Sequence, residues 1–322
     1  MSEQPLIRAT DVAVEYRIGN RTTKALAGVS LDVKPSGYKL GIVGESGSGK
    51  STLGLSMMNL IEAPGRVVGG RVEYVGKNLF EMSDDDIRGF RWKEVAMVFQ
   101  SAMNAFSPVK RASDHITEVL RERSDISKSQ AREKALSLLA EVGIESDHAD
   151  DFPHELSGGM KQRAMIAMAL SLSPKVLIAD EPTSALDVVV QKQILQLLKR
   201  EVSRLGLSMV FITHDIPLLW GLVDDVAVMF AGEVVEKGPI SRILREPAHP
   251  YTEQLISSLL TLDSSLKMAE SKGSIFAPIA EQGCRYRLRC KYAFDRCAHE
   301  NPRLKIHGDV LVACHKYDQN PT

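Results

Sequence analysis

The sequence has no cysteine before residue 284, although the chain is 322 residues long. Its four cysteines, Cys284, Cys290, Cys297 and Cys314, all lie close to the C-terminal end. A long segment without cysteine, followed by a short one that holds all of them, predicts a separate C-terminal unit with its own stabilising device.

The chain also lacks a strong net charge and a long apolar run. Its 40 basic and 41 acidic residues nearly cancel, to a formal charge of −1 at pH 7. This balance gives no electrostatic reason to expect a nucleic-acid partner or binding to anionic lipid. The nearest candidate for a membrane span, "AMIAMALSLS", is too short and contains serines. The first residues, "MSEQPLIRATD", lack the basic and then apolar order of a signal peptide. We therefore expect a cytosolic protein that does not cross a membrane by itself.

What the sequence does contain is a series of short apolar runs separated by helical patterns. Such runs suit strands that are buried on both faces. Strands that alternate with helices indicate an α/β fold with a largely parallel sheet. The predicted strands are 39–43, 95–99, 176–179, 209–213 and 226–230, and the predicted helices are 50–62, 129–142, 157–172 and 187–205.

Two regions depart from this alternation. Residues 7–18 and 25–33 alternate apolar and polar side chains, which predicts antiparallel strands with one solvated face. Residues 101–156 contain turn residues and amphipathic helix but no convincing strand. We expect a helical subdomain there, inserted into the α/β core and extending over about 101–172.

The C-terminal third has its own predicted elements. Residues 231–238, "AGEVVEKG", predict a short surface hairpin, and residues 249–262 predict a helix. The polar stretch 263–274 is typical of a loop. The cysteine-bearing tail follows it.

A phosphate-binding pattern lies at 44–51, "GESGSGKS", between an apolar strand and a helix. Glycines let the backbone curl so that successive N–H groups point at phosphate oxygens, and the following helix adds its positive N-terminal end. Lys50 would reach the β- and γ-phosphates, and Ser51 would offer its hydroxyl to Mg²⁺. The candidate nucleotide-binding residues of this loop are Gly44, Glu45, Ser46, Gly47, Ser48, Gly49, Lys50, Ser51 and Thr52.

Polar side chains also follow three other predicted strands. The run "VLIADEP" ends in Asp180 and Glu181, "MVFITHD" ends in His214, and "VAMVFQ" ends in Gln100. Each taken alone has a structural explanation, as a solubilising strand end or a surface histidine. Together they lie at the carboxyl ends of predicted parallel strands, where open α/β sheets bind ligands. We expect Asp180 to hold Mg²⁺, directly or through water, and Glu181 to act as the general base for an attacking water.

A second glycine-containing loop, "LSGGMKQ" at 156–162, precedes a predicted helix but does not follow a strand. It is therefore not expected to line the same pocket as Lys50. Two interpretations remain open for it. Ser157 can be a plain helix N-cap, or its hydroxyl and the amides of Gly158 and Gly159 can bind an anion presented by another copy of the fold.

In this order and spacing, the phosphate loop, Gln100, "LSGGMKQ", "VLIADEP", "SALD" (184–187) and His214 resemble the ATP-binding cassette (ABC) ATPases. The likeness runs from about residue 7 to residue 240. It implies a RecA-like P-loop core with an antiparallel β subdomain and an inserted helical subdomain. It also implies that two chains sandwich two ATP molecules, with the serine-glycine loop of one chain capping the nucleotide of the other.

The same resemblance assigns further roles. Ser157 and Gly159 would act in trans, in the place that an arginine finger takes in other ATPases, so an isolated subunit should hydrolyse ATP slowly. Tyr16 would stack on adenine and Asp187 would bridge the dimer. Gln100 would sense Mg²⁺ and water, and His214 would contact the γ-phosphate. Lys50, Gln100, Glu181 and His214 are thus the expected catalytic residues.

The resemblance is more specific over "DEPTSALDVVVQ", "PAHPYTEQLISSL" and the cysteine-bearing tail, which are similar to ATPase subunits of dipeptide and oligopeptide importers. It implies an ATPase domain at 1–240 and an extension at 241–322. The expected partners are a related but different ATPase, two membrane permease subunits and an external substrate-binding protein, with this chain at the cytoplasmic face of the membrane. The substrate would be a peptide, or an oligosaccharide as in some such systems.

Two stretches depart from the family's usual wording, "VFQSAMNAFSPV" and "HDIPLLWGLVDDV". The first lies where the family contacts its permease, so the permease and the substrate are not defined by the resemblance. Every catalytic position is present.

The spacing of the four cysteines matches neither a zinc knuckle nor a ferredoxin run. Disulfides are disfavoured in the cytosol, and four unrelated buried thiols would not explain the clustering. The family resemblance points to a [4Fe–4S] cluster, with zinc or no metal as alternatives. His299, His307 and His315 are expected at the surface, although one of them could replace a cysteine as a ligand.

Two other functions compete with transport. A non-transport ABC ATPase of DNA repair would carry long coiled coils between the phosphate loop and "LSGGMKQ", and a translation factor would usually carry two cassettes; this chain has neither feature. A nucleotide-binding regulatory module without turnover would not need Glu181 and His214.

Overall fold

The computed structural model describes residues 4–100, 106–184, 186–260 and 278–318. Its centre is a mixed sheet in which five neighbouring strands are parallel, in the order β9-β3-β8-β7-β6, and three antiparallel strands, β10, β12 and β11, continue it beyond β9. The strands of this sheet are β3 (Lys39–Val43), β6 (Val95–Val98), β7 (Val176–Asp180), β8 (Ser208–Thr213), β9 (Asp225–Phe230), β10 (Glu233–Pro239), β11 (Lys305–His307) and β12 (Val310–Val312).

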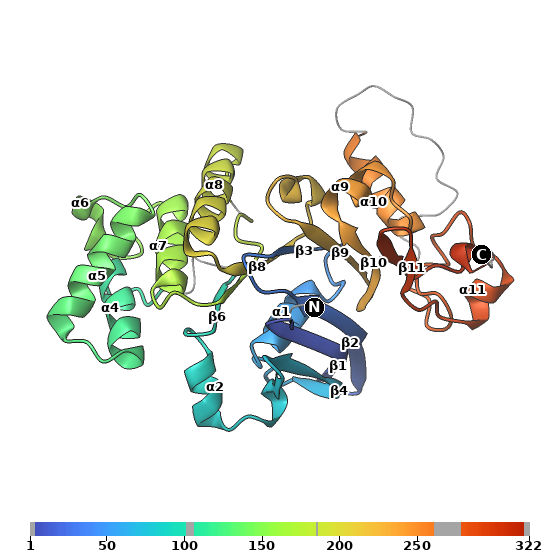
Figure 1. Cartoon of the computed structure of the whole chain (residues 1–322), viewed down its shortest axis with the longest axis horizontal. Coiled ribbons are helices and arrows are strands. Elements are labelled where there is room, and N and C mark those ends of the chain that lie inside the picture. The colour runs from blue at the N-terminus through green and yellow to red at the C-terminus, as the bar shows by residue number, and fades with distance from the viewer. Residues whose placement is uncertain (1–3, 101–105, 185, 261–277, 319–322) are drawn as a thin grey trace.

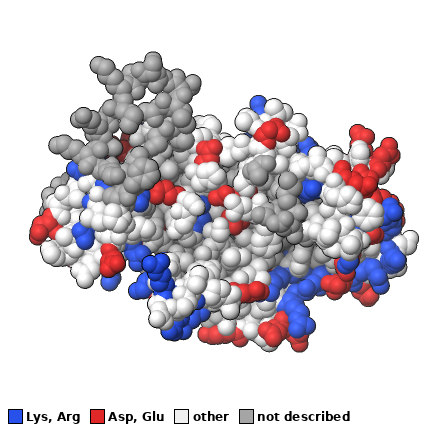
Figure 2. Space-filling view, turned by 180° about the vertical axis from the view of Figure 1, so that it is seen from behind, with Lys and Arg blue, Asp and Glu red and all other residues white. Residues whose placement is uncertain are grey.

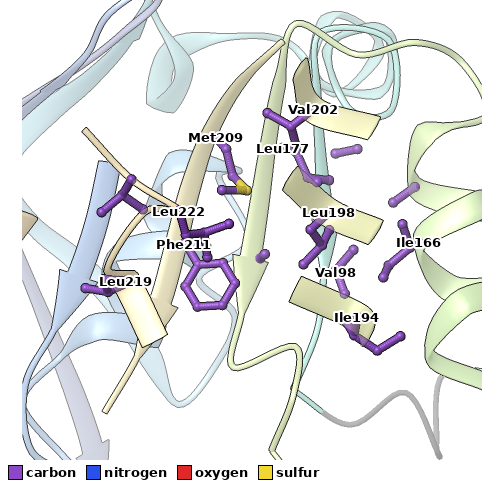
Figure 3. Packing of buried hydrophobic residues seen from close by; sticks show 14 of the residues in the cluster. Val98, Ile166, Leu177, Ile194, Leu198, Val202, Met209, Phe211, Leu219 and Leu222 are labelled. Carbon is purple, nitrogen blue, oxygen red and sulfur yellow. The ribbon is translucent and has the colours of Figure 1, made fainter. Parts of the chain in front are cut away.

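The parallel strands are buried on both faces, as their apolar runs predict. Successive residues of β7 point into two different cores: Leu177 packs on the side of the long helices, and Ile178 packs on the opposite side. Met209 and Val210 of β8 divide in the same way. Figure 3 shows Leu177 and Met209 facing Leu198 and other apolar side chains of the helical layer. Each such fully buried side chain contributes roughly 1.5–3 kcal/mol of hydrophobic free energy.

A separate antiparallel sheet, of order β2-β1-β4-β5, covers the second core. Its strands are β1 (Ile7–Ile18), β2 (Arg21–Val33), β4 (Gly65–Tyr74) and β5 (Lys77–Asn78). In β1, Ile7, Ala9, Val12 and Val14 are buried while residues between them are more exposed. This confirms the predicted antiparallel strands with one solvated face.

The predicted helical subdomain is also confirmed, apart from residues 101–105, which lie outside the described residues. It forms one end of the molecule (Figure 1). Its helices are α4 (Ala112–Arg123), α5 (Lys128–Glu141), α6 (Ser146–Ala149) and α7 (Gly158–Leu170). Helix α5 begins with a full capping box, in which Ser127 and Gln130 satisfy each other's backbone N–H groups.

The remaining helices pack around the sheets and in the C-terminal third. They are α1 (Lys50–Met57), α2 (Asp84–Phe90), α8 (Val188–Leu205), α9 (Ile240–Arg245), α10 (Pro250–Leu260) and α11 (Asp295–His299), with 3₁₀ turns η1 (Leu79–Glu81), η2 (Ile216–Leu219) and η3 (His315–Tyr317). No helix within the described ranges is both long and apolar enough to span a bilayer.

Most predicted bounds agree with the structure to within one or two residues. Helix α1 is the main exception, since it ends at Met57 and not at 62. Asn59 takes a left-handed conformation with φ of 50°, which stops the helix, and its side-chain amide donates to the backbone oxygen of Leu79 at 3.0 Å. The predicted loop at 263–274 lies outside the described residues.

The prediction of a surface hairpin at 231–238 was half wrong. The segment does turn back on β9 as the strand β10, but β10 lies inside the sheet between β9 and β12. Glu236 is fully buried. Its carboxylate accepts the backbone N–H groups of Ala248 at 2.8 Å and His249 at 2.9 Å, which compensates the loss of water. Burial nevertheless raises the pKa of Glu236.

The C-terminal extension is continuous with the core. Strand β12 pairs with β10, so the tail adds strands to the central sheet. Figure 1 shows β11 and α11 at the end of the molecule opposite the helical subdomain. On the face drawn in Figure 2, basic and acidic side chains lie close to one another.

Candidate active site

The glycine-rich loop connects β3 to α1, as its sequence predicts. Two of its glycines are required by close backbone contacts. A Cβ atom at Gly44 would overlap the backbone oxygen of Met229, and one at Gly49 would overlap that of Ala25. Gly49 also has φ of 99°, which L side chains rarely adopt. The loop is therefore packed tightly against the strands behind it.

Lys50 is buried at the start of α1, with 5% of its surface exposed. Its amine donates to the backbone oxygens of Gly44 at 2.8 Å and Glu45 at 2.9 Å. Burial lowers the pKa of Lys50, and the carboxylates of Glu181, Asp180 and Glu45 oppose this effect. The ammonium is thus already held inside the loop.

Ser51 and Asp180 form the pair of oxygens that a magnesium ion would need. The Ser51 hydroxyl donates to Asp180 Oδ1 at 3.1 Å. Asp180 is 6% exposed, and burial raises its pKa, an effect that the Ser51 hydrogen bond and the charge of Lys50 counteract. A hydroxyl and a carboxylate beside a phosphate-binding loop are hard oxygen ligands of the kind that Mg²⁺ prefers. The residues present therefore fit the ion.

Glu181 is held by a neighbour on each carboxylate oxygen. Gln100 Nε2 donates to Oε2 at 2.9 Å, and His214 Nδ1 lies 3.2 Å from Oε1. The backbone of Glu181 has φ of 44°, a conformation that costs free energy in a residue with a side chain. Its N–H donates to the backbone oxygen of Ile212 in β8 at 2.9 Å, which helps to hold the strained turn.

These groups meet because β3, β8, β7 and β6 are adjacent parallel strands whose carboxyl ends lie at one edge. The predicted convergence is confirmed. A pocket of about 730 Å³ at this edge is lined by Thr23, Lys24, Ala25, Glu45, Ser46, Gly47, Gly49, Lys50, Ser51, Thr52, Gln100, Glu181, His214 and Leu255.

Sequence reasoning missed four lining residues. Thr23, Lys24 and Ala25 belong to β2, where an ordinary strand pattern gives no sign of a binding role. Leu255 comes from α10 in the C-terminal extension, one helical turn after Tyr251. Leu255 and Tyr251 are four residues apart and therefore share one face of the helix. The sequence gives no sign that this face lies against the phosphate loop.

The serine-glycine loop does not line this pocket, as predicted. Ser157 is the N-cap of α7, and its hydroxyl accepts the N–H of Met160 at 3.2 Å. Gly158 begins the helix, and a Cβ at Gly159 would lie 2.7 Å from a methyl group of Val190. The capping role of Ser157 is thus present within the chain. It does not exclude the other interpretation, in which the loop binds an anion presented by another copy of the fold.

Five other candidate residues of the nucleotide site also lie outside the pocket lining: Tyr16, Gly44, Ser48, Asp180 and Asp187. The Tyr16 ring packs beside Gly65. Asp187 is the N-cap of α8 and accepts the N–H groups of Val189 at 3.0 Å and Val190 at 2.9 Å. Ser48 is buried in the glycine-rich loop, and its hydroxyl has no hydrogen-bond partner among the described residues.

Comparison with known proteins agrees with this geometry. The family model described as "ABC transporter" matches residues 26–184, and the model "Oligopeptide/dipeptide transporter, C-terminal region" matches residues 235–297. The dipeptide transport ATP-binding protein DppF of Escherichia coli is 40% identical, over 99% of this chain and 96% of that protein. The chain belongs to the ATP-binding subunits of ABC transporters of the oligopeptide/dipeptide type.

Other relatives of this ABC subunit cover similar lengths. The dipeptide transport ATP-binding protein DppD of Caldanaerobacter subterraneus is 39% identical, over 98% of each chain. A solved dimeric, post-hydrolysis structure of the ATP-binding cassette MJ0796 bound to ADP and Pi superposes with a TM-score of 0.64. It is 30% identical and covers 73% of this chain and 98% of its own.

The extension of this ABC subunit brings all four cysteines to one small pocket, which they line together with His249 and His315. Burial, reinforced by the nearby charges of Cys297, Cys290 and Cys314, raises the pKa of Cys284 to about 11. Burial also raises the pKa of Cys290 and Cys314. All four are free thiols. In the part of the chain that the structure describes, no three His, Cys, Asp or Glu side chains form a group that could hold a metal ion.

One expectation about the histidines was wrong. His315 is buried, not at the surface. Its Nδ1 lies 3.0 Å from Asp318 Oδ2 and its Nε2 lies 2.9 Å from the backbone oxygen of Glu300, so both ring nitrogens already have partners. His299 and His307 are exposed, as expected.

Proposed function

We propose that this subunit hydrolyses ATP to drive the import of peptides, or of oligosaccharides, through a membrane permease. The observation that carries the proposal is the position of Glu181. It lies at the edge of the sheet beside the phosphate loop, with one carboxylate oxygen bound by Gln100 and the other beside His214. Such a carboxylate can accept a proton from a water that attacks the γ-phosphate.

The other residues of the pocket have complementary roles in this proposal. The loop amides and Lys50 would bind the phosphates, and Ser51 and Asp180 would hold Mg²⁺, which would neutralise charge on the phosphate oxygens. Gln100 and His214 orient Glu181 and the attacking water. When water adds to the γ-phosphorus and the bond to the β-phosphate oxygen breaks, ADP and phosphate leave and Glu181 retains the proton for later release. Tyr16 stacks on the adenine.

We further propose that the site is completed by a second ATPase chain. Ser157, Gly158 and Gly159 lie outside their own chain's pocket, and Asp187 caps the neighbouring helix α8. The relative MJ0796 forms a dimer bound to ADP and Pi. In the proposed pair, each serine-glycine loop contacts the nucleotide held by the other chain, and Asp187 contacts the partner. The partner is a related but different ATPase.

The transport role follows from the kind of proteins to which the chain is similar. The Escherichia coli and Caldanaerobacter relatives are dipeptide transport proteins. They favour transport over the two alternatives, a non-transport ABC ATPase and a regulatory module without turnover. We propose that the subunit works at the cytoplasmic face of the membrane, with two permease subunits and an external binding protein that selects the substrate.

The test of hydrolysis is the variant Glu181→Gln in the assembled transporter. It keeps the hydrogen-bonding shape of the side chain but cannot take up the proton. ATPase activity should fall by roughly 10²–10⁴-fold while ATP still binds. Unchanged turnover would show that Glu181 is not the base, and absent turnover in the unmodified assembly would favour the regulatory module.

Substrate class needs a separate experiment. The complete transporter, with its binding protein, is reconstituted in vesicles, and uptake of labelled dipeptides, longer peptides and oligosaccharides is compared with and without ATP. ATP-dependent uptake of one class identifies it. ATP-independent accumulation, or none of any class, would contradict the proposed import role.

We also propose that the four cysteines hold a [4Fe–4S] cluster. The support is that four thiols line one pocket, which is the number of cysteine ligands that such a cluster needs. In the described residues the thiols are not grouped closely enough to hold a metal ion, so they would have to move together when the cluster binds. The cluster would cross-link a tail that has little core of its own. Protein purified without oxygen should be brown, absorb broadly in the visible-blue region and bleach with dithionite. A colourless protein with stoichiometric zinc, or with no metal, would refute the cluster.

A further inference from the structure

Two side chains of the C-terminal extension form hydrogen bonds with one residue of the phosphate loop, Glu45. The backbone N–H of Glu45 donates to the Tyr251 hydroxyl at 2.9 Å. The guanidinium of Arg289 donates to Glu45 Oε2 at 3.0 Å, and the Arg289 side chain is only 13% exposed. Tyr251 belongs to α10, and Arg289 lies directly before Cys290.

Both groups are held firmly in the extension. Tyr251 is 1% exposed and its ring packs against Phe230 at 4.8 Å and Tyr286 at 5.5 Å between centroids. Its own N–H donates to His249 Nδ1 at 3.0 Å. The guanidinium of Arg289 lies over the same Phe230 ring, 5.4 Å from its centroid. A shared aromatic platform at the end of β9 therefore fixes both contacts.

Glu45 passes this constraint to the phosphate-binding lysine. While its N–H and its side chain are bound by the extension, its backbone oxygen accepts hydrogen bonds from Lys50 Nζ at 2.9 Å and from the N–H of Ser48 at 3.1 Å. All three polar groups of Glu45 are thus engaged. Displacement of Glu45 would move the oxygen on which Lys50 rests and the amides that follow it.

We propose that Tyr251 and Arg289 are positioning residues that hold the phosphate loop in its nucleotide-accepting form. The C-terminal extension thereby sets the affinity for ATP as well as supplying Leu255 to the pocket wall. This inference rests on the ATP-binding role proposed above. Neither residue lines the pocket, so both would act through Glu45.

The experiment measures binding of a fluorescent ATP analogue to the full chain, with Mg²⁺ present. Tyr251→Phe keeps the packed ring but leaves the Glu45 N–H without an acceptor. Arg289→Gln removes the charge beside Glu45. Because a lost hydrogen bond to a buried group typically changes an equilibrium severalfold, each variant should bind ATP roughly three- to tenfold more weakly. Arg289→Lys should recover part of the loss.

A control variant lies two residues further along the same segment. Lys291 pairs with Glu253 at 2.7 Å on the exposed surface, so Lys291→Gln disturbs the extension without touching the phosphate loop. It should bind ATP as the unmodified chain does. In the assembled transporter, Tyr251→Phe and Arg289→Gln should raise the KM for ATP and leave kcat nearly unchanged.

A double-mutant cycle tests whether Arg289 acts through Glu45. If it does, Arg289→Gln combined with Glu45→Gln should be no weaker than the more affected single variant. Wild-type affinity in both Tyr251→Phe and Arg289→Gln would overturn the inference, as would an equal loss in Lys291→Gln. If one variant does not fold, as judged by its unfolding midpoint, the other decides. Failure of the unmodified chain to bind ATP would instead refute the proposed function.

Discussion

The Ser51 hydroxyl and the Asp180 carboxylate, 129 residues apart in the sequence, meet at 3.1 Å. They belong to the start of α1 and the end of β7, which face each other because β3 and β7 flank the same strand, β8. The hydrogen bond preassembles two oxygen ligands at the mouth of the phosphate loop.

Replacement of Asp180 by asparagine should remove the dependence of ATP binding on Mg²⁺. The unmodified chain should bind ATP more tightly with Mg²⁺ than with a chelator, whereas Asp180→Asn should show no difference. Since burial raises the pKa of Asp180, holding its charge costs the fold free energy, and the variant should be at least as stable. Titrations with and without EDTA, together with urea unfolding, test this. A persistent Mg²⁺ effect in the variant would show that other ligands suffice.

The two roles of Ser157 can be separated with a matched serine. Ser157→Ala and Ser127→Ala each remove an N-cap in the helical subdomain, so each should lower the free energy of unfolding by about 1 kcal/mol. Only Ser157→Ala should also reduce ATPase activity of the assembly, by about 10²-fold, since a donor to the transferring phosphate is lost. Equal activity of the two variants would leave Ser157 with a capping role alone.

Gly49 should not tolerate a side chain. Gly49→Ala forces a Cβ into the backbone oxygen of Ala25 at φ of 99° and should weaken ATP binding by more than about tenfold through loop strain. Gly89 in α2 is the matched control because its Cβ would meet open space. Gly89→Ala should bind ATP normally and gain about 0.5–1 kcal/mol of stability from helix propensity. Nucleotide titration and urea unfolding measure both effects. Normal binding by Gly49→Ala would mean that the loop can relax around the added methyl group.

The buried His249 should make the protein sensitive to acid. Burial lowers the pKa of His249 to about 3, while its hydrogen bond to the backbone of Ala313 opposes the shift. In the unfolded chain the histidine has a pKa near 6.5, so below that pH it is protonated while the buried His249 of the folded chain is still neutral. The free energy of unfolding that the neutral His249 contributes is therefore fully present above pH 6.5. It decreases between pH 6.5 and pH 3, by up to about 1.4 kcal/mol per pH unit.

His249→Asn is the variant for this measurement, since asparagine offers an acceptor to the N–H of Tyr251 without titrating. Urea unfolding of both proteins between pH 7 and 4 should give a shallower pH slope for the variant. Identical slopes would show that His249 does not enter the acid transition.

The parts of the fold that were predictable share one physical cause. Apolar runs such as 176–179 are buried on both faces wherever they lie in a parallel sheet, so their bounds and the polar residues after them follow from the sequence. Glu181 and His214 met as expected because the strand ends of such a sheet share an edge.

The rest depended on contacts that no local pattern encodes. The sequence predicts that Glu236 is exposed, but the residue is buried. Its carboxylate accepts hydrogen bonds from two backbone N–H groups of a segment later in the chain. The strands β11 and β12 have three residues each, too few to show a period. Arg289 and Glu45 are 244 residues apart. Their pairing is a product of the finished fold.

The pairing of β12 with β10 has a consequence for any shortened form of the chain. A chain cut after residue 240 would keep every residue of the pocket except Leu255, yet it would leave the N–H and C=O groups of β10 without their neighbours along one side. A bare strand edge recruits other strands, from a second copy of the same chain if nothing else is present. We therefore expect the tail to protect the protein against aggregation, and a chain cut after residue 240 to be less soluble than the full chain.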